Sequence, residues 1–162
     1  MSKNMEKSTN KIELTRQQFE NLLKLVYLGN WMVNANRDGS SENPHIEKYE
    51  AIEDYIFSFA EQFGCGEYVD GEEATKGKFY PTRLFEEETD VQKLIEEYDE
   101  ETFWDELIDH LGERALFRRY SKDEIKNMSQ DERFEKLCEF IDKWADEINE
   151  HGIGRLKIVK GD

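Results

Sequence analysis

The chain has 162 residues, 37% of them hydrophobic, and its 38 acids against 22 bases give a net charge of −16. This charge excludes nonspecific affinity for nucleic acid and for anionic membranes, both of which attract basic proteins. Because residues 1–11 are polar and the two cysteines lack metal-type spacing, we expect a cytoplasmic protein without a secretion signal. We expect residues 1–11 to form a disordered tail and residues 12–162 to form one helical domain.

The first predicted helix covers residues 15–36. Thr15 and Gln18 have the spacing of a capping box, in which two side chains bond the free backbone N–H groups of a helix start. Within this helix, residues 22–33 include nine apolar side chains of twelve, and they fall on every side. A helix that is apolar all round is typical of a protein interior, whereas a membrane span needs about 20 consecutive apolar residues. We therefore predict a buried central helix.

The second predicted helix begins at Asn43, with Pro44 at its first helical position, and ends at Gly64. Its apolar residues keep a spacing of three and four, which predicts an amphipathic helix packed against the first one. These residues are Ile46, Tyr49, Ile52, Tyr55, Ile56, Phe59, Ala60 and Phe63.

Residues 65–82 are rich in glycine and include one of the two prolines, which excludes regular helix for most of the segment. We predict short strands at 67–69 or 78–80 and a third at 156–159, which would pair with one of them. A loop of this length is often functional, although a surface excursion without a role is the simpler interpretation.

The segment 86–109 is strongly acidic, with twelve acids and one base, Lys93, for a net charge of −11. We predict two helices within it, the second capped by Asp99. On a helix these carboxylates come about one per 3 Å, close to the phosphate spacing along a DNA strand. The segment is therefore predicted to dock a basic partner protein, or alternatively to mimic nucleic acid, while the simplest alternative is a solvated face. The predicted docking residues are Glu96, Glu97, Glu100, Glu101 and Asp105.

The remaining elements are helices with clear starts. Ser121 with Glu124 predicts a short helix, and Ser129 with Glu132 predicts the last long helix, which ends at Gly152. Together the patterns predict a mainly α fold, a single-domain bundle of four to five long helices around residues 22–33, with a possible small two-stranded β addition.

Candidate chemistry is sparse. Two acid pairs three residues apart, Glu50 with Glu53 and Glu96 with Asp99, are similar to the magnesium-binding pairs of all-helical nucleotide pyrophosphatases. About nine such pairs arise by chance in a chain this acidic, so the pattern has little specificity. We predict no catalytic residue, no metal and no cofactor. The favoured function is a noncatalytic acidic interaction or regulatory module, with a small divalent-metal-dependent hydrolase as the alternative.

Overall fold

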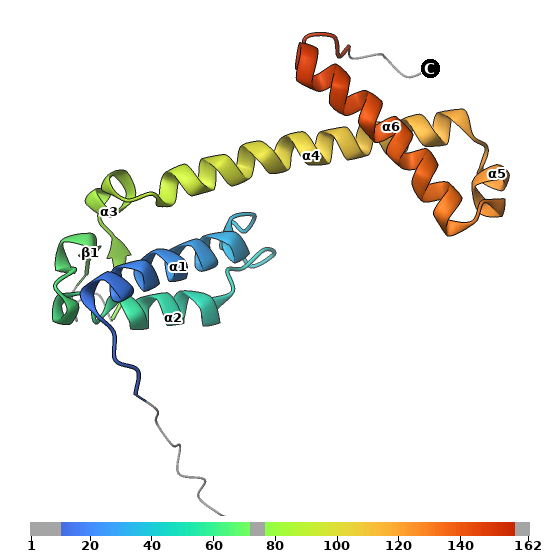
Figure 1. Cartoon of the computed structure of the whole chain (residues 1–162). Helices are drawn as coiled ribbons and strands as arrows, with labels where there is room; N and C mark the ends of the chain where they lie inside the picture. The colour runs from blue at the N-terminus through green and yellow to red at the C-terminus, as the bar shows by residue number, and fades with distance from the viewer. Residues whose placement is uncertain (1–10, 72–76, 158–162) are drawn as a thin grey trace, which may run out of the picture. The chain divides into compact units, whose positions relative to one another are not determined.

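The computed structural model describes residues 11–71 and 77–157 of the chain. Within them it has six α-helices, two short 3-10 helices and a two-stranded antiparallel sheet (Figure 1). The predicted fold class, mainly α with a small β addition, is confirmed. Among the described helices, none has the length and apolar character needed to cross a membrane.

Contacts divide the chain into two compact units: unit 1 is Met1–Ile95 and unit 2 is Glu96–Asp162. The boundary falls inside the longest helix, α4 (Val91–Arg119). That residues 12–162 act as one domain stays a prediction. Residues 1–10 of the predicted tail lie outside the described residues.

Helix α1 (Arg16–Asn34) begins as predicted. The Thr15 hydroxyl accepts a hydrogen bond from the Gln18 backbone N–H at 3.3 Å, and the Gln18 side chain accepts one from the Thr15 N–H at 2.9 Å. The prediction that this helix is buried all round is wrong, because Leu23 is 0% exposed whereas Leu25 is 68% and Met32 is 58% exposed. Unit 1 packs against one side of α1 only, and apolar composition cannot report how many neighbours a helix has.

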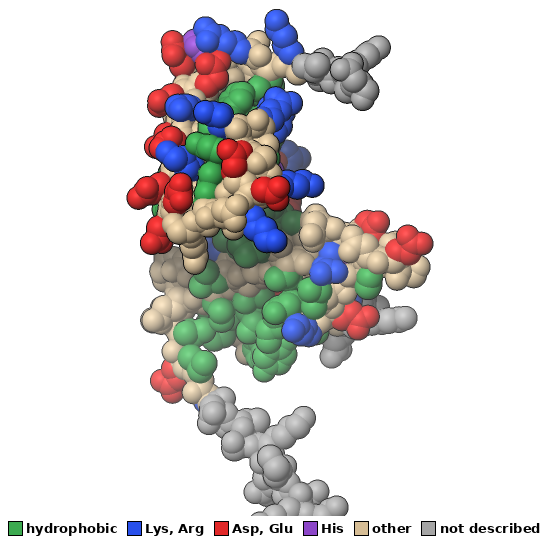
Figure 2. Space-filling model, turned by 90° about the vertical axis from the view of Figure 1, so that its right-hand side faces the viewer, with side chains coloured by type: hydrophobic (Ala, Val, Ile, Leu, Met, Phe, Trp, Pro, Cys, Tyr) green, Lys and Arg blue, Asp and Glu red, His purple; other side chains and the backbone are tan. Residues whose placement is uncertain are grey.

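Helix α2 (Glu47–Phe57) lies beside α1 (Figure 1) and is shorter than predicted. Its N-cap is Ile46 without a side-chain cap, because the predicted cap, Asn43, instead donates to the Asn36 carbonyl in the preceding loop at 2.8 Å. The chain then forms a 3-10 helix, Glu61–Phe63, and turns at Gly64, whose φ of 69° suits glycine. Hydrophobic side chains gather on the outer surface over α1 and α2 (Figure 2).

A second 3-10 helix, Gly66–Tyr68, leads into the sheet, in which β1 (Val69–Asp70) pairs antiparallel with β2 (Tyr80–Pro81). Both strands therefore come from the glycine-rich segment itself. The predicted C-terminal strand is not part of this pairing, and residues 158–159 of it lie outside the described residues.

Helix α3 (Arg83–Glu88) is capped by Thr82, and α4 follows as one helix of 29 residues. The predicted helix start at Asp99 is wrong. Residues 91–119 contain no proline and a single glycine, so nothing interrupts the backbone hydrogen bonds and Asp99 stays inside the helix. Helices α5 (Lys122–Asn127) and α6 (Gln130–His151) start at the predicted serine caps.

Each unit has its own core. In unit 1 the ring of Phe85 makes edge-on contacts with three other rings, those of Tyr27, Phe57 and Tyr68, at centroid distances of 5.4, 6.0 and 5.8 Å. In unit 2, α4 and α6 approach closely at Gly112, where an added Cβ would lie 2.7 Å from the Ile141 side chain.

Candidate functional site

The five predicted docking residues all lie in α4, on the unit 2 side of the boundary, and all are exposed. They do not share one environment. Glu101 and Asp105 are four residues apart and flank Trp104, whereas Glu96, Glu97 and Glu100 precede them along α4 and lie outside the groove described next.

A groove of about 600 Å³ runs between α4 and α6 within unit 2. Its apolar lining includes Trp104 and Ile108 from α4 and the buried Ile148 from α6. Glu101 and Asp105 line the same groove, so their negative charge stands beside a half-buried indole ring. This combination suits a cationic side chain that also carries apolar surface.

Unit 1 has a second candidate site, a pocket of about 360 Å³. Three segments line it: one face of α1, one face of α2, and residues 78–81, which include β2. The lining residues are Tyr27, Asn30, Trp31, Glu50, Glu53, Asp54, Lys78, Phe79, Tyr80 and Pro81. Spacings of three and four residues on both helices point these side chains into the same space.

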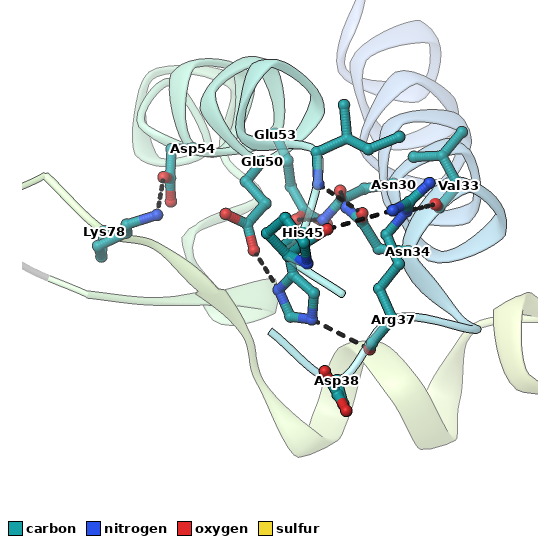
Figure 3. Close-up of polar contacts among 12 residues, drawn as sticks. Asn30, Val33, Asn34, Arg37, Asp38, His45, Glu50, Glu53, Asp54 and Lys78 are labelled. Carbon is teal, nitrogen blue, oxygen red and sulfur yellow. Dashed lines mark hydrogen bonds and ion pairs between the residues drawn. The ribbon is translucent and has the colours of Figure 1, made fainter. Parts of the chain in front are cut away.

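Glu53 is held in this pocket by a chain of amides (Figure 3). Its carboxylate accepts a hydrogen bond from Asn30 Nδ2, and Asn30 Oδ1 accepts one from Asn34 Nδ2 at 2.8 Å. Asn34 Oδ1 in turn accepts from the Ile46 backbone N–H at 2.8 Å, which ties this chain to the start of α2. The network fixes the Glu53 side chain through neutral partners.

Burial raises the pKa of Glu53 to about 7, because the charged carboxylate loses water. The nearby carboxylates of Asp54 and Glu50 raise the pKa further, while the hydrogen bond from Asn30 and the charge of Lys78 oppose the shift. Glu53 therefore changes its charge near neutral pH.

The two other carboxylates of the pocket have basic partners. Glu50 Oε1 lies 2.8 Å from His45 Nδ1, and the second ring nitrogen of His45 lies 3.2 Å from the Arg37 carbonyl oxygen. Asp54 accepts from the Phe79 backbone N–H at 2.9 Å and pairs with Lys78 Nζ at 3.2 Å. Asp54 thus positions the segment that closes the pocket (Figure 3).

Tyr27 connects the pocket to α3 and α4. Its hydroxyl donates to Glu86 at 3.2 Å and accepts from Gln92 Nε2 at 3.4 Å. Burial, together with the charge of Glu86, raises the pKa of Tyr27 to about 12, so the phenol stays neutral in the physiological range.

The two acid pairs considered for magnesium belong to different units. Glu50 and Glu53 line the unit 1 pocket, while Glu96 and Asp99 are exposed on the unit 2 part of α4. Over residues 11–71 and 77–157, no group of three or more His, Cys, Asp or Glu side chains has an arrangement that could hold a metal ion.

The pocket residues other than Glu50 and Glu53 were missed by sequence reasoning. A usable signal was present in Asn30 and Asn34, two amides four residues apart at the end of the mostly apolar stretch of residues 22–33. Buried amides need hydrogen-bond partners, which points to a polar site on that face. The sequence carries no such signal for residues 78–81, because their place in the pocket depends on how the loop folds back.

No protein family, no curated protein and no solved structure matches this chain.

Proposed function

We propose that the protein is a noncatalytic interaction module that docks a basic partner protein at the groove between α4 and α6. The observation that supports this best is the position of Glu101 and Asp105 beside Trp104 in a groove of about 600 Å³. Acidic residues at the rim attract a basic surface and speed its association, while the aromatic ring supplies the apolar contact that slows dissociation.

The partner expected from this chemistry is a segment in which lysine or arginine residues flank an apolar side chain. Its apolar group would lie against Trp104 and Ile108, and its charges would face Glu101 and Asp105. Glu96, Glu97 and Glu100 extend the negative charge along α4 and would act mainly on the rate of encounter. A partner that otherwise binds nucleic acid has the same chemistry.

The test begins with copurification of the tagged protein to identify a partner, followed by binding kinetics on the purified pair. We expect the association rate constant to fall at least tenfold between about 50 and 300 mM salt. The variant Glu101→Gln/Asp105→Gln should weaken binding at least fivefold, and Trp104→Ala should mainly raise the dissociation rate.

A matched control removes the same charge elsewhere in unit 2. Glu135 and Asp146 are exposed on α6 and do not line the groove, so Glu135→Gln/Asp146→Asn should change the affinity less than twofold. Equal losses in both double variants would mean that net charge alone matters. Binding that resists both salt and the groove substitutions would refute the proposal.

A further inference from the structure

The pocket of unit 1 combines aromatic walls with carboxylates. Four of its lining residues carry rings, namely Tyr27, Trp31, Phe79 and Tyr80. Three others, Glu50, Glu53 and Asp54, carry acids. Aromatic faces attract cations, most strongly those that are weakly hydrated, and neighbouring carboxylates add a full opposite charge. The lining therefore has the chemistry of a receptor for an organic cation.

The charge balance within the pocket singles out Glu53. Glu50 lies against the His45 ring, and Asp54 is paired with the Lys78 ammonium. Glu53, by contrast, is held by the neutral amide of Asn30. A half-buried carboxylate with a neutral partner is stabilised by any cation that enters beside it.

We propose that this pocket binds a small organic cation bearing an alkylated ammonium group, with Glu53 as its counter-ion and the ring of Trp31 against its methyl groups. The site lies in unit 1 and is independent of the α4–α6 groove. Its volume of about 360 Å³ falls within the range of small-molecule sites. An anion is disfavoured by three carboxylates against one lysine, and a neutral ligand would leave the Glu53 charge desolvated.

Binding of a cation is linked to the protonation of Glu53. Three charged groups act on Glu53: the carboxylates of Glu50 and Asp54 on α2, and the ammonium of Lys78 just before β2. His45 lies beside Glu50. Tyr27 of α1 also lines the pocket, and its hydroxyl is hydrogen-bonded to Glu86. Since the pKa of Glu53 is raised to about 7, the carboxylate is mostly protonated at pH 6 and mostly charged at pH 8. A cation favours the charged form, so its affinity should rise up to about tenfold over this interval.

The experiment is a titration of the full chain with choline and, separately, with its neutral isostere 3,3-dimethylbutan-1-ol. Binding is measured by calorimetry and by the shift of the Trp31 indole N–H resonance. We expect choline to bind at pH 8 and to shift the Trp31 signal, and the isostere to bind at least tenfold more weakly. Choline binding should be reduced at pH 6.

Two variants complete the test. Glu53→Gln keeps an oxygen that accepts from Asn30 but has no charge, so choline affinity should fall at least tenfold and lose its pH dependence. Glu47→Gln removes an exposed acid of α2 that does not line the pocket, and it should bind choline like the wild type. The proposal is overturned if choline does not bind at millimolar concentration, if the isostere binds equally well, or if Glu53→Gln binds choline unchanged.

Discussion

The unit 1 pocket and the unit 2 groove both place acids beside a tryptophan, but the two settings differ in solvent access. In the pocket, Glu53 is partly buried, held by an amide chain, and has a pKa raised to about 7. In the groove, Glu101 and Asp105 are exposed and stand at the rim. This difference is the reason that we propose a small cationic ligand for the pocket and a large basic surface for the groove. The environment of an acid decides its use more than the number of acids nearby.

The largest expected effect is the loss of stability when a buried core residue of either unit is truncated. Leu23 of unit 1 is 0% exposed and Leu116 of unit 2 is 1% exposed, so Leu23→Ala and Leu116→Ala should each lower the free energy of unfolding by about 2–5 kcal/mol. Denaturant unfolding measures both. Leu25→Ala, at a position that is 68% exposed, should change it by less than about 0.5 kcal/mol. A comparable loss at Leu25 would mean that α1 is covered on both sides.

The second prediction compares two helical glycines, one in a crowded position and one in an open position. At Gly112 an added Cβ would meet Ile141 side-chain and backbone atoms at 2.7 and 3.2 Å, so Gly112→Ala should destabilise unit 2 by about 1–3 kcal/mol through overpacking. At Gly29 nothing lies within 4 Å. Gly29→Ala should therefore stabilise α1 by about 0.5–1 kcal/mol, because alanine favours the helix. Thermal unfolding of the two variants distinguishes the signs, and shifts in the same direction contradict the assigned α4–α6 contact.

The third effect concerns the pocket carboxylate directly. The pKa of Glu53 is raised from 4.5 to about 7 on folding, so the folded state binds more protons between these values. This contribution to stability is lost as pH rises through that window. A shift of this size is worth about 3 kcal/mol for a fully buried group, and solvent contact reduces our expectation to about 1–2 kcal/mol.

The corresponding variant is Glu53→Gln, which should be more stable than the wild type above pH 7 and gain little near pH 5. Denaturant unfolding at a series of pH values gives the difference in unfolding free energy between the variant and the wild type. Titration of the other acids largely cancels in this difference. Glu47→Gln is the control on the same helix. An equal gain at all pH values shows that Glu53 does not titrate in this window.

Local signals in the sequence predicted the elements well, because helix starts depend on neighbouring residues. The capping boxes at Thr15 and Ser121 both form as predicted. The Asp99 prediction was wrong because an N-cap residue is used only where a helix actually begins, and the surrounding helix formers continue through it.

The sequence predicted the arrangement of these elements in space less well. Nothing in residues 22–33 reveals that Leu25 and Met32 face away from the unit 1 core. The pocket depends on residues from positions 27 to 81, and the hydrogen bond from the Phe79 backbone to Asp54 that helps to build it follows from the fold of the loop. Such long-range contacts leave no periodic signal in a single sequence.

The smallest effect compares the helix starts of the two units. Thr15 and Ser121 each accept a hydrogen bond from the N–H three residues on, at 3.3 Å in both cases, and each receives the reciprocal side chain. Thr15→Ala and Ser121→Ala should each cost about 1 kcal/mol, because an N–H at the helix start loses its partner. Thr15→Ser retains the hydroxyl and should cost much less. Amide hydrogen exchange should accelerate at Gln18 in the first variant and at Glu124 in the second, each without a change in the other unit. If either substitution speeds amide exchange in both units, the two units open together. Their stabilities would then be coupled, even though their two candidate sites differ.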